Sequence, residues 1–251
     1  MAGLEGRTAL VTGASSGIGS STARALAQAG ARLALGARRV DKVEALASEL
    51  PGDHFAGELD VTDAASAAAF VDQAASILGR IDILVNNAGL ALGRVTIEDG
   101  NDEDDRTMLE TNVLGLVRIT RLVLPHMEDG TGHVVNLGSW AGHEAYPMGG
   151  LYVGSKTAVR ALTEVMRKEL VGRIKVSTVD PGMVGDTEFS DVRFGGDAEK
   201  KNSVYSGVDY LTPDDIAECI LWVVTRPPYM VVDEMVVKPL QQASQDAIVR
   251  R

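Results

Sequence analysis

The chain of 251 residues contains a single cysteine, Cys219, so no intrachain disulfide can form. This scarcity fits a reducing compartment. Because Cys219 lies in the helix-like run DIAECILWVV, we expect a buried structural thiol there rather than a nucleophile. No apolar run reaches the roughly 18 residues that a membrane-spanning helix requires. The N-terminal residues 1–7 form no apolar signal region, which favours a cytoplasmic protein without a membrane partner.

Positive charge is also scarce. The chain has 24 Lys and Arg against 35 Asp and Glu, and its net charge of −11 argues against nucleic acid as a partner. The acidic run at residues 98–105 is interpreted as a solvated loop that leads into a helix, not as a cation site. No metal site is predicted, because the histidines lack ligand-like spacing. They lie at His54, His126, His133 and His143.

Short apolar runs alternate with alanine- and leucine-rich helical stretches, and no linker or repeat divides the chain. Runs without polar alternation are typical of strands covered on both faces, which occur in parallel sheets flanked by helices. The sequence therefore predicts one α/β domain over residues 1–251, a Rossmann-type doubly wound parallel sheet of about seven strands with helices on both faces. The expected strands cover residues 8–13, 32–37, 55–61, 82–89, 133–139, 175–182 and 233–239.

The turn VTGASSGIG at residues 11–19 follows the first expected strand and opens the first expected helix. Glycine lets a phosphate approach the backbone closely, and a helix N-terminus offers free N–H donors. Glycine turns between strand and helix also occur for steric reasons alone, but this context favours dinucleotide binding. The expected cofactor contacts in this turn are Gly13, Ser15, Ser16, Gly17, Ile18 and Gly19.

The end of the second expected strand indicates which dinucleotide is bound. Folds specific for NAD place an acid about 20 residues beyond the glycines, where it holds the ribose hydroxyls. Here Ala37 occupies that position, and Arg38 and Arg39 follow. Two guanidinium groups can hold the 2′-phosphate of NADP(H) through bidentate hydrogen bonds. We predict NADP(H) over NAD(H), with a solvent-facing basic helix start as the alternative interpretation.

Further cofactor contacts are expected where later strands end, because the carboxyl ends of parallel strands line the ligand crevice of such sheets. Asp60 and Val61 end the third expected strand. The NNAG turn follows the fourth, where small residues can lie against the adenosine half of a dinucleotide. Its expected contacts are Asn87, Ala88 and Gly89.

Tyr152 is the only tyrosine in the chain with a lysine four residues later, Lys156. Residues at this spacing share a helix face. Carbonyl reduction needs a proton donor beside the forming alkoxide, and a nearby ammonium should lower the pKa of the Tyr152 phenol towards the working range. Ser139, at the end of the fifth expected strand, can donate a hydrogen bond to the substrate oxygen. Alone, the pair would more often be an ordinary helix face, but the combination with the glycine loop favours catalysis.

In this order the motifs resemble the short-chain dehydrogenase/reductase family over nearly the whole chain. The family's Thr-Gly-x3-Gly-x-Gly motif is matched within residues 12–19, and its Asn-Asn-Ala-Gly motif by residues 86–89. The resemblance implies a catalytic set in which an asparagine anchors a water that leads to the lysine. That set is Asn112, Ser139, Tyr152 and Lys156. It also implies cofactor contacts by Tyr152, Lys156, Pro181, Gly182, Val184 and Thr187.

The carboxyl-terminal third, which begins PGMVGDTEFSDVRFGGD at residue 181, resembles the NADP-dependent 3-hydroxy acid dehydrogenases, a group that includes serine and allo-threonine dehydrogenases. The resemblance implies a homotetramer that transfers hydride between NADP(H) and C3 of a small 3-hydroxy acid or its semialdehyde. Residues of about 183–212 are expected to form a substrate loop. Within it, Arg193 is a candidate for binding the substrate carboxylate, and an exposed loop arginine is the equal alternative.

Two departures from the family pattern leave other functions open. Residues 98–108 lack the tryptophan often found before the Asn112 helix, and Trp140 directly follows Ser139, where it could narrow the substrate pocket. A short-chain aldehyde or ketone reductase of another substrate class, of the sulfoacetaldehyde or clavulanate type, is therefore an alternative. The others are a non-catalytic NADPH-binding scaffold and a nucleotide-sugar epimerase or dehydratase, for whose substrate domain the chain leaves little room.

Overall fold

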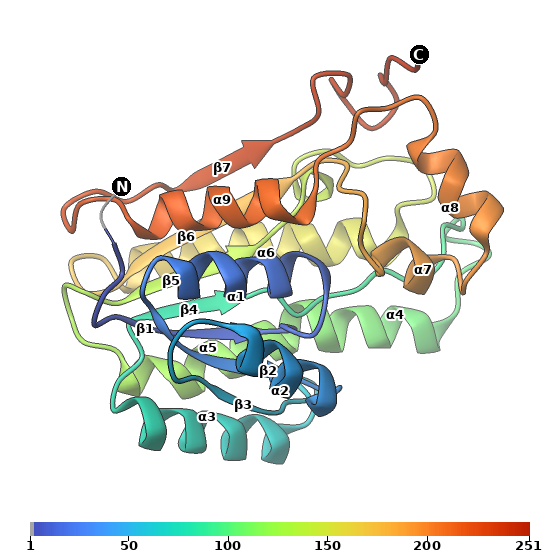
Figure 1. Cartoon of the computed structure of the whole chain (residues 1–251). Coiled ribbons are helices and arrows are strands. Elements are labelled where there is room, and N and C mark those ends of the chain that lie inside the picture. Colours follow the sequence, from blue (N-terminus) through green and yellow to red (C-terminus); the bar gives the residue numbers. More distant parts are fainter. Residues whose placement is uncertain (1–2) are drawn as a thin grey trace.

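The computed structural model describes residues 3–251, Lys201 by its backbone alone, and its strands form one seven-stranded parallel sheet (Figure 1). The strands are β1 (Thr8–Thr12), β2 (Arg32–Ala37), β3 (Phe55–Glu58), β4 (Ile83–Asn86), β5 (His133–Leu137), β6 (Lys175–Pro181) and β7 (Glu234–Val237). Their order is β3-β2-β1-β4-β5-β6-β7, and every neighbouring pair is parallel. The order reverses direction between β1 and β4, which is the switch point of a doubly wound sheet. The predicted fold is confirmed.

Helices cover both faces of this sheet, as the sequence predicts (Figure 1). They are α1 (Gly17–Gln28), α2 (Val40–Glu49), α3 (Ala64–Leu78), α4 (Asp102–Leu109), α5 (Leu116–Val123), α6 (Gly150–Glu169), α7 (Phe189–Arg193), α8 (Ala198–Tyr205) and α9 (Pro213–Val224). Successive strand residues face opposite sides. Ala9 and Val11 thus pack in the apolar cluster with α1, α2 and α9, and Leu10 packs in the cluster with α3 and α5.

The acidic run adopts the interpreted structure. It forms a loop that leads into α4, and Asn101 caps this helix by accepting a hydrogen bond of 2.9 Å from the backbone N–H of Asp104. Between α4 and α5 the helix widens into a π turn over Glu110–Gly115. Short 3-10 turns over Leu124–His126 and Trp140–Gly142 follow α5 and β5.

The described residues can be compared with three expectations from composition, which concern membrane-spanning helices, metal sites and Cys219. Among residues 3–251, no helix has the length and apolar character needed to cross a membrane. The same part of the chain has no group of three or more His, Cys, Asp or Glu side chains placed to hold a metal ion. Cys219 is half-buried rather than buried, and burial raises the pKa of its thiol, which fits an unreactive side chain.

Candidate active site

A cleft of about 680 Å³ lies at the carboxyl edge of the sheet. Segments far apart in the sequence line it, from the glycine loop after β1 to α7 and α8. All but one of the residues predicted to contact the cofactor line this cleft. They are Gly13, Ser15, Ser16, Gly17, Ile18, Arg38, Arg39, Asp60, Val61, Asn87, Ala88, Gly89, Tyr152, Lys156, Pro181, Gly182, Val184 and Thr187.

The exception is Gly19, the last glycine of the loop, which is not among the residues that line the cleft. A Cβ at Gly19 would lie 2.3 Å from the carbonyl oxygen of Gly13 and 2.4 Å from Asn87 Nδ2, so this position needs glycine for close packing. The Asn87 amide donates hydrogen bonds of 2.9 Å and 3.1 Å to the carbonyl oxygens of Thr12 and Gly13. The NNAG turn therefore holds the glycine loop in place, a role that sequence reasoning missed.

The N-terminus of α1 faces the cleft beyond this loop. Its cap residue, Ser16, has an extended backbone and makes no side-chain hydrogen bond to the helix. The Ser16 hydroxyl donates instead to Glu188 Oε2 at 3.0 Å. The N–H groups of the first helical turn, from Gly17 and Ile18, keep the geometry that binds phosphate in dinucleotide folds.

Arg39 folds back over the glycine loop. Its Nη2 atom donates to Ser15 Oγ at 2.9 Å and to Ser16 Oγ at 3.0 Å. The same atom lies 2.7 Å from Glu188 Oε2. Arg39 is the N-cap residue of α2, and its half-exposed guanidinium is held at the rim of the cleft, whereas Arg38 is exposed.

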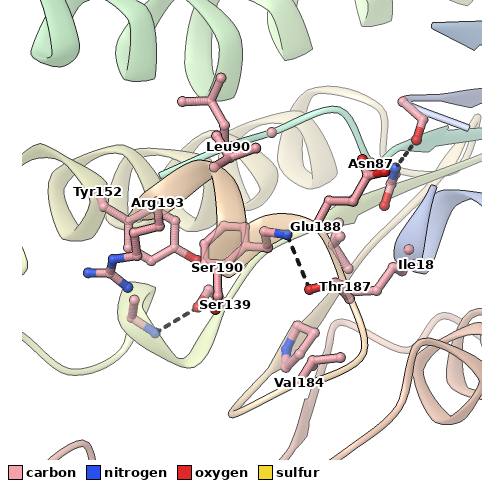
Figure 2. A pocket seen from close by; sticks show the side chains of 18 of the residues that line it. Ile18, Asn87, Leu90, Ser139, Tyr152, Val184, Thr187, Glu188, Ser190 and Arg193 are labelled. Carbon is pink, nitrogen blue, oxygen red and sulfur yellow. Dashed lines mark hydrogen bonds between the residues drawn. The ribbon is translucent and has the colours of Figure 1, made fainter. Parts of the chain in front are cut away.

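Tyr152 lies in the first turn of α6 and is only 8% exposed. Its phenol hydrogen-bonds with Ser139, whose Oγ also accepts a hydrogen bond of 3.1 Å from the Ala141 backbone N–H. The Phe189 ring meets the Tyr152 ring edge-on, with centroids 5.7 Å apart, and the guanidinium carbon of Arg193 lies 5.4 Å from the Tyr152 ring centroid. Figure 2 shows Tyr152, Ser139 and Arg193 gathered at one end of the pocket.

The predicted effect of Lys156 on this phenol is wrong for the isolated chain. Burial raises the pKa of Tyr152 to about 12, and the hydrogen bond with Ser139 and the charge of Arg193 oppose that rise. The Lys156 ammonium donates instead to the carbonyl oxygen of Leu137 at 2.9 Å, and the cation that lowers the pKa of the phenol is Arg193. The phenol of Tyr152 is therefore protonated in this structure and can donate a proton, and the guanidinium of Arg193 lies over its ring.

Lys156 is only 7% exposed. Burial lowers the pKa of its ammonium to about 8, and the nearby carboxylate of Asp180 opposes that change. A Cβ at Gly89 would lie 3.7 Å from Lys156 Nζ and 3.2 Å from Asn112 Oδ1. Gly89 therefore lies beside both the Lys156 ammonium and the Asn112 amide oxygen.

Asn112 does not line the cleft. It lies buried in the π turn, a type of irregular turn that is common at functional sites. Its Nδ2 atom donates to the Leu90 carbonyl oxygen at 2.8 Å and to Ser155 Oγ at 3.0 Å, and its Oδ1 atom accepts from the Leu90 N–H at 2.9 Å. The Asn112 side chain therefore fixes the backbone that follows the NNAG turn.

Arg193 is half-buried in the cleft instead of exposed on a loop. Its Nε atom donates to the carbonyl oxygen of Gly93 at 3.1 Å, and its Nη2 atom lies 3.5 Å from the hydroxyl of Tyr146. Sequence reasoning missed the contact of Phe189 with Tyr152. The spacing of four residues between Phe189 and Arg193 was the available signal, because it places both on one face of α7.

The hypothesis that Trp140 narrows the pocket is wrong. Trp140 is not among the residues that line the cleft. Its ring stacks on His143 with centroids 5.5 Å apart, Lys238 Nζ lies 3.8 Å from its ring centroid, and its Nε1 donates to Glu144 Oε2 at 2.6 Å. Trp140 therefore packs against the carboxyl-terminal segment and leaves the space in front of Ser139 open.

A Rossmann-type sheet with a tyrosine, serine and lysine at its carboxyl edge is the arrangement of a dinucleotide-dependent oxidoreductase. The family model described as short chain dehydrogenase matches residues 7–195, and the chain belongs to this family.

Similar proteins within this family are named as hydroxy acid and serine dehydrogenases. The chain is 43% identical over 258 residues to an NADP-dependent 3-hydroxy acid dehydrogenase of Schizosaccharomyces pombe, with 100% of this chain and 99% of the relative covered. It is 39% identical over 238 residues to the serine 3-dehydrogenase of Agrobacterium fabrum, with 94% and 95% covered. The closed form of a serine dehydrogenase complexed with NADP+ superposes with a TM-score of 0.92 at 37% identity, over 97% of this chain and 99% of that one.

Proposed function

We propose that the protein transfers hydride between NADP(H) and the C3 hydroxyl or carbonyl of a small 3-hydroxy acid or its semialdehyde. The observation that carries this proposal is the position of Arg193, whose guanidinium carbon lies 5.4 Å from the ring of Tyr152. A cation beside the proton donor can hold a substrate carboxylate while the hydroxyl carbon faces the phenol. The names of the relatives support the same substrate class.

The chain's own residues fit NADP(H). The glycine loop and the first turn of α1 would hold its pyrophosphate, Arg38 and Arg39 its 2′-phosphate, and Thr187 its nicotinamide amide. When bound, NADP(H) supplies or accepts the hydride. Gly13 packs closely against the NNAG turn, since an added Cβ would lie 2.9 Å from the Ala88 Cα, so the position needs glycine.

In the direction of reduction, the neutral phenol of Tyr152 gives its proton to the oxygen of the forming alcohol. Ser139 donates a hydrogen bond to that oxygen as negative charge develops on it. The positive charge of Arg193 favours the phenolate that remains. In the direction of oxidation, the same phenolate takes the proton from the alcohol.

Lys156 and Asn112 have supporting roles in this proposal. Lys156 would bind the cofactor ribose with its ammonium, and Asn112 would support the relay that returns a proton from solvent. Since both Asn112 amide protons are already donated, the asparagine would act in that relay through the backbone that it holds at Leu90.

The guanidinium of Arg193 binds a sulfonate as well as a carboxylate, so a reductase of the sulfoacetaldehyde type is the second candidate. A screen of NADP+ reduction separates the two. The panel is L-serine, D-serine, allo-threonine, 3-hydroxyisobutyrate, 2-hydroxyethanesulfonate and uncharged secondary alcohols. The proposal expects turnover of at least one 3-hydroxy acid above all the others. Turnover of the sulfonate alone supports the second candidate, and no turnover with any alcohol supports an NADPH-binding scaffold.

We also propose a cytoplasmic homotetramer, in which residues 183–212 form the substrate-binding segment. Residues 106–124 and 152–170 have enough apolar positions to pack against a partner as well as the sheet, and large apolar side chains are exposed in both segments, namely Leu114 at 49% and Val165 at 47%. Light scattering at micromolar concentration tests this assembly, and a monomer would contradict it.

A further inference from the structure

Glu188 immediately precedes α7 and places its carboxylate in a group of donors at the other end of the cleft. Its Oε2 atom lies 2.7 Å from Arg39 Nη2 and accepts a hydrogen bond of 3.0 Å from Ser16 Oγ. Its Oε1 atom accepts one of 3.2 Å from Lys42 Nζ. Figure 2 shows Glu188 between the end of the pocket that holds Tyr152 and the end that holds Ile18. One side chain thus ties the segment after β6 to the glycine loop and to α2.

These donors suit a phosphate as well as they suit a carboxylate, because both ligands offer anionic oxygens to a guanidinium and to hydroxyls. Arg39 is fixed for this purpose by its contacts with Ser15 and Ser16. The hydrogen bond from Arg39 lowers the pKa of Glu188 to about 2, so the carboxylate is charged at every pH at which the protein works. The Glu188 carboxylate and a bound phosphate repel each other at contact distance. Arg39 therefore cannot form its full set of hydrogen bonds with both anions at once.

We propose that Glu188 competes with the 2′-phosphate of NADP(H) for Arg39 and Ser16, and that the phosphate releases the segment that Glu188 holds. The inference rests on the proposed function only in requiring that NADP(H) binds. It links the two ends of the cleft, because Phe189 and Arg193 follow Glu188 directly in α7 and contact Tyr152. Recognition of the phosphate would then alter the segment that carries the substrate cation, and by reciprocity the substrate would alter the affinity for the cofactor.

The backbone conformation of Asp186, two residues before Glu188, is consistent with a segment fixed by its contacts. Asp186 has a φ of 51°, in the left-handed region that residues other than glycine rarely adopt. Aspartate adopts this region more readily than most residues do. The contacts that hold the segment are the hydrogen bond of 3.2 Å from the Tyr210 hydroxyl to Asp186 Oδ1 and the tie from Glu188 to Arg39 and Lys42.

Hydrogen–deuterium exchange of residues 186–205 tests the release. The probes are adenosine 2′,5′-bisphosphate, which carries the 2′-phosphate but no nicotinamide, and adenosine 5′-monophosphate, which lacks that phosphate. We expect the bisphosphate to speed exchange in this segment and the monophosphate to leave it unchanged. Slower or unchanged exchange with the bisphosphate overturns the inference. Calorimetry of the same probes separates a failure of this inference from a failure of NADP(H) binding itself.

A pair of variants tests the competition by affinity. Glu188→Gln removes the competing charge, so the Kd for NADP+ should fall about two- to fivefold, the range expected for a half-exposed ion pair, while the Kd for NAD+ stays unchanged. Asp41→Asn is the matched control, because Asp41 acts on Arg39 by charge alone. An equal gain in both variants would reveal a general effect of charge. Weaker binding of NADP+ by Glu188→Gln would mean that Glu188 helps to hold the cofactor. Either result overturns the competition.

Discussion

Ionisable side chains are buried at both edges of the sheet, but neighbouring charges and hydrogen-bond donors compensate them to different degrees. At the amino edge, Asp82 is 1% exposed and has two arginines beside it, Arg80 Nε at 3.0 Å and Arg7 Nε at 3.5 Å. The backbone N–H of Thr8 also donates to it at 2.8 Å. The buried negative charge of Asp82 is thus compensated by charges and donors on neighbouring elements.

At the carboxyl edge, Lys156 and Tyr152 are buried with weaker compensation, which comes from Asp180 for the ammonium and from Ser139 and Arg193 for the phenol. The ammonium of Lys156 has the neutral carbonyl of Leu137 as its hydrogen-bond acceptor, and its pKa falls to about 8. The phenol of Tyr152 is held neutral, with a pKa of about 12. Fully compensated charge at one edge stabilises the fold, whereas the weakly compensated groups at the other edge are available for proton transfer and charge stabilisation. Four substitutions test this contrast, from the largest expected effect to the smallest.

Tyr152→Phe should lower kcat by a factor of about 10² to 10⁴, because it removes the proton donor. The Kd for NADP+ should stay within about twofold of the wild-type value, since the ring and its packing remain. Steady-state kinetics and calorimetry measure the two quantities. Tyr146→Phe, in the same cleft, is the control and should retain most of the activity. A Tyr152→Phe enzyme within tenfold of wild type would remove the acid–base role.

Asp82→Asn should destabilise the fold by about 2–3 kcal/mol, because it leaves two arginines at the amino edge without their buried anion. Denaturant unfolding measures this change. The kcat of the folded fraction should stay the same, since Asp82 lies at the opposite edge from the cleft. A loss of kcat at unchanged stability would contradict the division of roles between the edges.

Arg193→Met should raise the KM for a 3-hydroxy acid about 10- to 100-fold and change the KM for an uncharged ketone little. The basis is the loss of one charge-assisted hydrogen bond, worth about 1.5–3 kcal/mol. Arg94→Met is the matched control, because Arg94 lines the same cleft. Equal changes for the acid and the ketone would exclude a role in binding the carboxylate.

Lys156→Met should stabilise the fold by about 1 kcal/mol at pH 7, after the lost hydrogen bond to Leu137 is counted. The pKa of this lysine is about 8 in the fold and 10.5 in the unfolded chain. The penalty for burying its charge is therefore complete below pH 8 and disappears as the pH rises towards 10.5. The stability gain of the variant should shrink over that window. A gain that does not depend on pH would contradict this origin.

Much of the fold was predictable because its signals are local. Apolar runs without alternation, such as ALVT in β1 and ILVN in β4, mark strands covered on both faces. The same holds for the shared helix face of Tyr152 and Lys156, which depends only on their spacing. Local patterns also predicted which loops reach the carboxyl edge, since each one follows a strand.

What could not be predicted depends on tertiary contacts. Glu188 meets Ser16, which lies 172 positions away in the chain, and no spacing rule connects the two residues. The hydrogen bond of the Lys156 ammonium to the carbonyl of Leu137 depends on the rotamer of the lysine and on a neighbouring strand, so helix periodicity could not show it. Burial of the phenol, which decides its pKa, is likewise a property of the packed cleft.

The most direct test of the account is the ionisation of Tyr152 itself. Phenolate absorbance, compared between the wild-type protein and Tyr152→Phe without cofactor, reports on this single side chain. The account predicts no difference attributable to a phenolate at residue 152 up to pH 10, because burial holds its pKa at about 12. A phenolate at residue 152 that forms near neutral pH would contradict the assignment of Tyr152 as a neutral proton donor.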